Sequence, residues 1–233
     1  STPKPSSAAS DVYKRQNIYS PIIGTDLVRT DSKSFKVLED NCRTPSGVSY
    51  MIENRTTMKH MFPELFATNK VKSIADYPRQ LFEALSKSGR EICENPTIAV
   101  LTPGVHNSAY YEHTTLARLM GVELVEGRDL IIEDQHVHMK TASGLKKIDI
   151  IYRRIDDDYL DPLNFNSNSV LGLAGIMDSY RQGNVVIVNA PGTGIADDKA
   201  SYIYVPKMIK YYLNEEPILS NIKTYQLSDI DQK

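Results

Sequence analysis

From residue 96 onward, continuous apolar runs alternate with amphipathic segments. Residues 97–101 form an unbroken apolar run, which is typical of a parallel strand buried on both faces. The same pattern predicts strands at 122–125, 148–153 and 184–188, a hairpin at 130–133 and 136–140, and helices at 107–120, 170–182, from about 196, and at 206–213. Strands and helices in this alternation are typical of an open α/β layer structure.

Before residue 96 the pattern is less regular. Two β-like runs, 24–29 and 35–39, are joined by a polar turn and predict a hairpin. Apolar residues at helical spacing predict a helix over 77–88. A Pro-Ser-Gly turn at 45–47 precedes a short segment, 48–54, and residues 55–76 follow no clear period.

The first sixteen residues have no apolar periodicity and are dominated at their start by Ser, Ala and Pro. They are interpreted as a disordered tail. The string SSAASDVYKRQ also resembles a translated sequencing adapter, so residues 1–16 are expected to be non-native and are left out of the fold prediction.

Composition and charge narrow the class of protein. Hydrophobic residues make up 41% and charged residues 24% of the chain, which is ordinary for a soluble globular protein. A net charge of −2 argues against a basic nucleic-acid surface. No apolar run reaches the roughly 18 residues that a membrane span needs. The two cysteines, Cys42 and Cys93, are too few for a disulfide scaffold, so we expect a reducing compartment such as the cytoplasm.

The predicted hairpin carries a group of oxygen-bearing side chains. Glu39 and Asn41 are two residues apart on one strand, so they point to the same face, and Asp26 could reach them from the other strand. Carboxylate and amide oxygens suit Mg²⁺, which keeps several waters and bridges substrate phosphates. The alternative is a solvated face with charge pairs, in which Arg29 and Arg43 would take part.

Two further charged or glycine-rich segments follow predicted buried strands. Arg153 and Arg154 precede four carboxylates in 156–161, at the end of a sheet where α/β proteins bind ligands. The arginines could clamp a carboxylate or phosphate, or the loop could simply neutralise itself. The turn 189–199 could present backbone N–H groups to an anion, but it matches neither phosphate-loop fingerprint, and a tight turn is the alternative.

The remaining polar candidates are weaker. Asn107 is predicted to cap the helix 107–120, and Glu112 to lie on one face of that helix. His136 and His138 could share a strand face, but no third metal ligand is nearby in sequence, which favours a surface hairpin.

Several long strings occur in a characteristic order: DLVR (26–29), VLEDN (37–41), RTPSG (43–47), ENR (53–55), LTPG (101–104), LAR (116–118), LVEG (124–127), YRRIDDD (152–158) and the turn 189–199. From about residue 18 to 230 they resemble the circularly permuted ATP-grasp proteins of type 2, which are similar to glutathionylspermidine synthetase. The resemblance implies an α/β fold with part of a circularly permuted ATP-grasp domain and a Rossmann-like pre-ATP-grasp central domain.

The resemblance also implies domain bounds and a reaction. Residues 17–94 would be a partial, β-rich ATP-grasp segment with a helix, 95–200 the pre-ATP-grasp-like domain, and 201–233 a helical segment leading into the other ATP-grasp half. The implied activity is ATP- and Mg²⁺-dependent ligation of a small-molecule or peptide-like carboxylate to an amine through an acyl phosphate. The alternative is a non-catalytic ligand-binding or assembly module that retains the fold.

Site residues follow from the resemblance as well. The metal positions are Asp26, Glu39 and Asn41, the set that the hairpin pattern also indicates. Phosphate- or carboxylate-contacting catalytic residues would be Arg29, Arg43 and Arg55. Cofactor-binding residues would be Asn189, Gly192, Gly194 and Lys199, and substrate-binding residues Asn107, Glu112, Arg153, Arg154, Asp156 and Asp157.

One departure from the family pattern affects activity. The family continues with a Lys-Pro and a Gly-Gly-Tyr-Gly stretch that holds ATP, and residues 201–233 contain no such string. We therefore expect this chain to be a fragment that does not turn over alone. A Rossmann-type oxidoreductase is a weaker hypothesis, because neither strand-to-helix turn carries the full glycine fingerprint.

Overall fold

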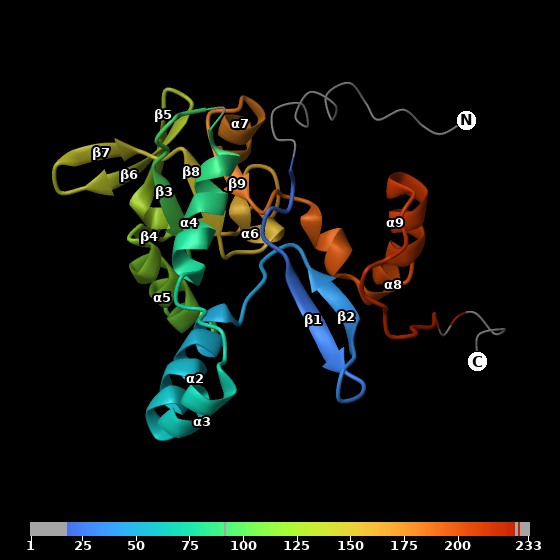
Figure 1. Ribbon diagram of the computed structural model, residues 1–233. Helices are drawn as coiled ribbons and strands as arrows, with labels where there is room; N and C mark the ends of the chain where they lie inside the picture. Colours follow the sequence, from blue (N-terminus) through green and yellow to red (C-terminus); the bar gives the residue numbers. More distant parts are fainter. Residues whose placement is uncertain (1–17, 91, 227, 229–233) are drawn as a thin grey trace.

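A computed structural model describes residues 18–90, 92–226 and 228 of the chain. The predicted non-native tail therefore lies outside the described residues. The centre of the fold is a four-stranded parallel sheet with the order β4-β3-β8-β9 (Figure 1). Its strands are β3 (Ile98–Leu101), β4 (Glu123–Val125), β8 (Ile150–Arg153) and β9 (Val186–Val188). Each lies within a predicted strand, so the parallel α/β arrangement expected for this part of the chain is confirmed.

One face of the sheet packs against two helices, α4 (Tyr77–Ser88) and α5 (Tyr110–Met120). Alternate strand residues point to this face, and Leu81, Leu85 and Leu116 cover them from the helices. The helix predicted at 77–88 is confirmed at both ends. The helix predicted from 107 begins instead at Tyr110, because Asn107 Oδ1 accepts a hydrogen bond from the Ala109 N–H in the preceding turn.

The other face is covered by an antiparallel sheet and two short helices. The sheet has the order β5-β6-β7, and its predicted hairpin around Asp134 and Gln135 is confirmed, with both residues at positive φ. Val137, Met139, Leu160 and Ile176 supply the core on this side. The elements are β5 (Leu130–Glu133), β6 (His136–Thr141), β7 (Gly144–Lys147), α6 (Asp157–Leu160) and α7 (Ile176–Arg181). A short 3-10 turn, η1 (Gly127–Asp129), leads into β5.

The hairpin of β1 (Gly24–Arg29) and β2 (Phe35–Asn41) projects from the α/β part of the molecule (Figure 1). It is the predicted hairpin, extended by two residues on the second strand. Val37 in β2 also exchanges backbone hydrogen bonds with Ser220 and Ile222, so the C-terminal segment runs alongside this strand. Before that segment the chain forms η2 (Thr193–Asp197), α8 (Lys199–Tyr202) and α9 (Val205–Leu213). The helix predicted at 206–213 is thus confirmed.

The helix prediction over 170–182 is too long. The α-helix covers only Ile176–Arg181, because the preceding glycines are needed for close backbone contact and a left-handed turn. A Cβ on Gly172 would lie 2.1 Å from the Leu160 carbonyl oxygen, and Gly175 has φ +85°.

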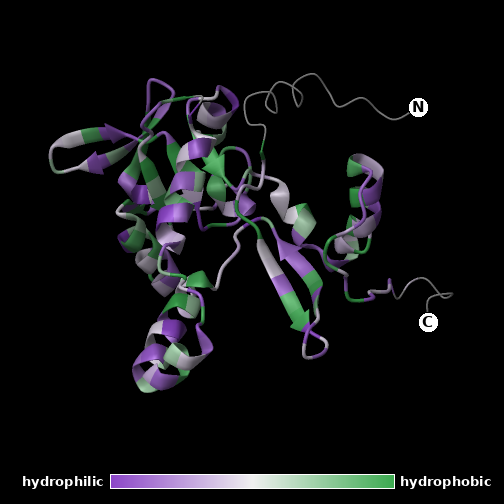
Figure 2. Cartoon of the chain, viewed as in Figure 1, coloured by the Kyte–Doolittle hydropathy of each residue, from purple (hydrophilic) through white to green (hydrophobic). Residues whose placement is uncertain are grey.

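The short segment 48–54 and residues 55–76, which followed no clear period, contain two helices. They are α2 (Val48–Met61) and α3 (Pro63–Asn69), and together they form an arm below the sheet (Figure 1). Figure 2 shows hydrophilic and hydrophobic residues mixed over this arm, and large apolar side chains such as Met51, Met61 and Leu65 are exposed. Because hydrophilic and hydrophobic residues are mixed over these helices, the sequence of the arm shows no helical periodicity. Among the described residues, no helix is long and apolar enough to cross a membrane.

Candidate functional site

The hairpin brings the three predicted metal positions to one face. Asp26 is paired directly with Glu39 across the two strands, and Asn41 follows two residues later on β2, so it points the same way. Lys199, the first residue of α8, places its ammonium 2.6 Å from Glu39 Oε2. The hydrogen bond to Glu39 raises the pKa of Lys199, and the charge of Asp26 adds to this effect. We call Asp26, Glu39, Asn41 and Lys199 the hairpin face.

The hairpin face carries two carboxylates and one amide oxygen. Among the described residues, no group of three or more His, Cys, Asp or Glu side chains is placed to hold a metal ion. Two carboxylates nevertheless fit Mg²⁺, which is usually held by one or two carboxylates together with substrate phosphates and water. The donor chemistry of the face therefore fits a magnesium–nucleotide complex.

Asn189 fixes the base of the hairpin to the central sheet. Its completely buried side-chain amide donates to the carbonyl oxygens of Ile22 and Cys42, at 2.6 and 2.5 Å, and its Oδ1 accepts from the Ile22 N–H at 3.3 Å. These two residues flank the hairpin on either side. Asn189, predicted to bind a cofactor, therefore acts here as a structural link that sets where the hairpin face lies.

Arg43 connects the hairpin to the glycine-rich turn. Its Nε lies 3.5 Å from Asp156 and 3.7 Å from Asp197. A Cβ on Gly194 would lie 3.1 Å from Arg43 Cδ, so glycine at this position makes room for the arginine. Gly192 has φ +90°, and its N–H donates to Asp157 at 3.2 Å.

A pocket of about 220 Å³ lies at the carboxyl ends of β3 and β8. This is the edge of the sheet where the sequence predicted a ligand site. It takes in three of the predicted substrate-binding residues, Asn107, Arg154 and Asp156. Thr44 and Ser46 of the RTPSG string also line it, together with His113 and Tyr159, which had no predicted role. The other lining residues are Pro103, Ala109, Ile155 and Leu171. We call this the strand-end pocket.

Glu112 was also predicted to bind substrate, but its carboxylate is occupied by other groups of the protein. Its carboxylate is completely buried and accepts from the N–H groups of Gly47 at 2.8 Å and Ser49 at 3.2 Å, which lie at the N-terminus of α2. Arg154 approaches the same carboxylate at 3.4 Å. Glu112 thus joins α2, α5 and β8, and it stabilises a helix start where negative charge is favourable.

Arg153 is likewise engaged by backbone and carboxylate groups. Its buried guanidinium donates to the carbonyl oxygens of Asn189, Ile155 and Ala190 at 2.7, 2.9 and 3.1 Å, and it pairs with Asp157 at 2.8 Å. Burial lowers the pKa of Arg153, while the negative charge of Asp157 opposes this shift. Arg153 and Asp157 join the loop after β8 to the loop after β9. They thereby stabilise the loop that carries Asp156, a residue of the strand-end pocket.

Two of the predicted catalytic arginines lie outside this region. Arg29 donates to the carbonyl oxygens of Asp31 and Ser32 at the tip of the hairpin. Arg55 lies on the α2–α3 arm, where it donates to Val71 and stacks 5.3 Å from the centre of the Phe66 ring. Of the three arginines, only Arg43 contacts a residue that lines the strand-end pocket, Asp156.

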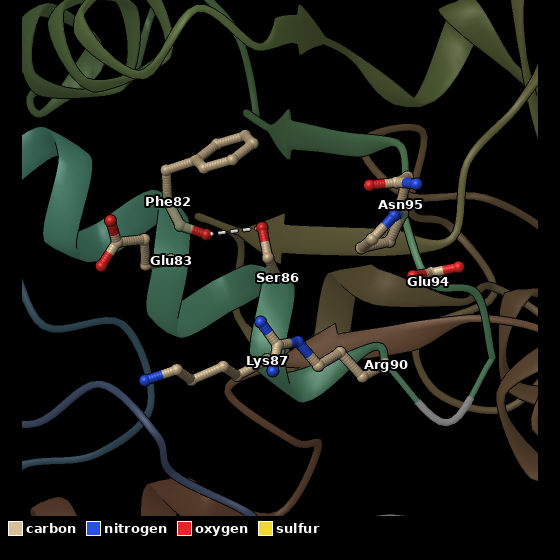
Figure 3. A pocket seen from close by; sticks show the side chains of 8 residues that line it. Phe82, Glu83, Ser86, Lys87, Arg90, Glu94 and Asn95 are labelled. Atoms are coloured by element: carbon tan, nitrogen blue, oxygen red, sulfur yellow. Dashed lines mark hydrogen bonds between the residues drawn. The ribbon is translucent and has the colours of Figure 1, made fainter.

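Two larger hollows lie elsewhere. One, of about 460 Å³, is formed by α4 and the segment just before β3, at the amino end of the sheet; Figure 3 shows Glu83, Lys87, Arg90 and Glu94 around it. Its charges have both signs. The other, of about 590 Å³, lies on the α2–α3 arm beside Arg55. Apart from Arg55, neither hollow is lined by a residue that was predicted to be catalytic or to bind metal, cofactor or substrate.

His113 is a buried, neutral member of the strand-end pocket. Its Nδ1 lies 2.8 Å from Thr102 Oγ1, and Thr102 Oγ1 also accepts from the Gly104 N–H. Burial, together with the smaller effect of the nearby charge of Arg154, lowers the pKa of His113 to about 4. The imidazole is therefore uncharged at neutral pH.

We expect this histidine to make the protein less stable in acid. Its pKa is about 4 in the folded chain and about 6.5 in an unfolded one. Between these values the unfolded state binds more protons, so the free energy of unfolding falls as the pH falls, by about 3 kcal/mol in all. Urea unfolding at several pH values measures this effect. The free energy of unfolding should depend less steeply on pH for His113→Asn than for the unchanged protein. The exposed His106→Asn variant should behave like the unchanged protein, and equal slopes for all three would contradict the prediction.

Comparisons with known proteins support the family resemblance that the sequence motifs indicated. A family model described as a circularly permuted ATPgrasp matches residues 5–233. The name of this family model ends in the number 1, so the match does not support the assignment to type 2 that the sequence motifs suggested. An uncharacterized protein of Synechocystis is 52% identical over 208 residues, which are 89% of this chain and 43% of that protein. An uncharacterized protein of Mycobacterium tuberculosis is 55% identical over 203 residues, 87% of this chain and 37% of that one.

A more distant relative carries a functional name. The protein named "Putative glutamate--cysteine ligase 2-3" from Frankia alni is 40% identical over 210 residues, which are 90% of this chain and 24% of that protein. The chain thus spans less than half the length of the relatives it matches here.

Proposed function

The chain belongs to the circularly permuted ATP-grasp family, and from this we propose that it is part of an ATP- and Mg²⁺-dependent ligase that joins a carboxylate to an amine. The observation that carries the proposal is the pairing of Asp26 with Glu39, with Asn41 on the same face and Lys199 beside it. Three residues after Asn41, Thr44 lines a polar pocket at the carboxyl ends of parallel strands, and Arg43, which comes between them in the chain, contacts the pocket residue Asp156.

The side chains fit the demands of phosphoryl transfer. When bound, ATP supplies the phosphoryl group that activates a carboxylate as an acyl phosphate for attack by an amine, and Mg²⁺ offsets the phosphate charge. Asp26, Glu39 and Asn41 would hold the metal ion. Lys199 and Arg43 are cations at the edge of the same region and would bind phosphate or carboxylate oxygens.

The substrates are proposed at the level of chemical class. Two Frankia relatives, 40% and 38% identical to this chain, are named "Putative glutamate--cysteine ligase 2-3" and "Putative glutamate--cysteine ligase 2-2". By extension we propose amino acids or peptide-like molecules as the carboxylate and amine partners. The positions of Asn189, Gly192 and Gly194 support a structural contribution to the nucleotide-binding region, because they shape the turn on which Arg43 packs.

Replacing Glu39 with glutamine tests the proposal. The variant removes one negative charge from the hairpin face, so the affinity for Mg·ATP should fall by about tenfold or more, since a charge-assisted contact is lost. Isothermal titration calorimetry of the protein with Mg·ATP measures this change. Glu133→Gln, at an exposed strand position on another sheet, is the matched control and should retain full affinity. Unchanged affinity in Glu39→Gln would favour a non-catalytic ligand-binding or assembly module.

A further inference from the structure

We propose that the strand-end pocket binds the charged end of a free α-amino acid, with Arg154 and Asn107 facing its carboxylate and Asp156 facing its ammonium group. The inference deepens the proposed ligase: the role of this amino acid as a reactant rests on that function. Its binding, by contrast, requires neither ATP nor Mg²⁺ and can be measured separately.

Arg154 supplies the positive end of the pocket. The side chain is almost completely buried, and its terminal nitrogens bond to the Tyr152 hydroxyl at 3.1 Å and to the Glu112 carboxylate at 3.4 Å. Its Nε is also buried and has no hydrogen-bond partner among the residues that the structure describes. An unpaired donor on a buried cation is costly, and Glu112 offsets the charge only from 3.4 Å, so a second carboxylate in the pocket would be attracted to this guanidinium.

Neutral donors stand beside the arginine. Asn107 uses its Oδ1 to accept from Ala109, which leaves its NH₂ group as a donor. Thr102 Oγ1 accepts from Gly104, so we assign its proton to the bond with His113 Nδ1. The remaining proton of the neutral imidazole is then on Nε2, where it can be donated. Three different side chains thus offer donors suited to one carboxylate.

Asp156 supplies the negative end. Its side chain is about half exposed, at 49%, and only its Oδ1 is involved in the contact with Arg43 at 3.5 Å. Oδ2 has no hydrogen-bond or ion-pair partner within the described part of the chain, so it can accept from an ammonium group in the pocket. The presence of both charge signs around one small space favours a zwitterion over a simple anion such as phosphate, because an anion would meet the Asp156 charge.

The size of the pocket also restricts the ligand. Its volume of about 220 Å³ is below the roughly 300–1,000 Å³ typical of sites for drug-sized molecules. The charged end of one amino acid fits this volume. The pocket and the hairpin face would then hold different ligands, with Arg43 in contact with Asp156 on one side and Asp197 on the other.

Calorimetry with simple probes tests the inference. L-alanine, L-cysteine and L-glutamate are titrated into the protein without ATP, and the tightest binder is compared with its amide, its 2-hydroxy acid analogue and inorganic phosphate. We expect the amino acid to bind at least about tenfold more tightly than each of these, since the amide lacks the carboxylate and the hydroxy acid lacks the ammonium group. Asp156→Asn should weaken the amino acid about tenfold and leave the hydroxy acid unchanged.

One variant serves as the control, and three results would overturn the inference. Asp158→Asn changes an exposed aspartate two residues away that does not line the pocket, and it should bind like the unchanged protein. No binding by any of the three amino acids, equal losses for amino acid and hydroxy acid, or tighter binding of phosphate would each overturn the inference. Glu39→Gln should keep its amino-acid affinity. If the unchanged protein bound the amino acid but not Mg·ATP, the ligase proposal would fall and this pocket assignment would stand.

Discussion

Glu112→Ala is expected to lower the free energy of unfolding by about 3–5 kcal/mol, as removal of one partner from a buried ion pair does. The carboxylate is completely buried and is the acceptor for the backbone N–H groups of Gly47 and Ser49. Alanine would leave these donors unsatisfied and would leave the buried Arg154 without its carboxylate partner. The start of α2 would lose its negative charge at the same time.

Urea unfolding followed by circular dichroism measures this loss, since the sequence contains no tryptophan for fluorescence. The matched control is Glu53→Ala, at an exposed position in α2, which should stay within about 0.5 kcal/mol of the unchanged protein. Glu112→Gln keeps an acceptor but not the charge and should fall between the two. If both alanine variants lost the same stability, the role assigned to Glu112 would be wrong.

Arg153→Met is expected to cost a similar amount, about 3–5 kcal/mol. Methionine retains much of the volume of the side chain but removes all of its donors. The carbonyl oxygens of Asn189, Ile155 and Ala190 would each lose a partner inside the protein, and Asp157 would lose its cation. The loops after β8 and β9 would no longer be joined through this guanidinium.

Arg128→Met provides the comparison for this variant. Arg128 also forms an ion pair, at 3.0 Å from Glu126, but its side chain is 77% exposed. Exposed pairs contribute about 0–1 kcal/mol, so this substitution should be nearly silent in the same urea experiment. A loss in Arg153→Met no larger than that in Arg128→Met would contradict a structural role for the buried guanidinium.

Elements with a regular apolar pattern were predictable, and those without one were not. Helix α4 and strand β3 were identified because their apolar residues face a single core and therefore repeat at the expected spacing. Helix α2 was missed because only Ser49 is buried along its length, so no stripe of apolar residues marks one face. The helix at 170–182 was overextended because Leu and Ala are good helix formers, and the close contact of Gly172 with Leu160 arises only in the folded chain.

The site shows the same division. The spacing of Glu39 and Asn41 defined a shared face without any tertiary information, and the strand pairing added Asp26 opposite Glu39. Glu112 looked like an ordinary helix-face residue because its backbone partners, Gly47 and Ser49, lie more than sixty residues earlier. His113 carried no signal at all, since a single histidine on a helix becomes informative only when its burial beside Arg154 is known.

The strand order also has a consequence for how the chain reaches its fold. β3 and β8 are neighbours in the central sheet, yet β4 and the whole β5-β6-β7 sheet come between them in sequence. Their contact must therefore wait for closure of a long loop, and such non-local pairings slow folding. The β5-β6-β7 meander pairs only strands adjacent in the chain, so it can form early and bring the end of β3 nearer to the start of β8. The antiparallel sheet, which shares its core with Ile155 of the strand-end pocket, would in this way influence the rate at which that pocket is assembled.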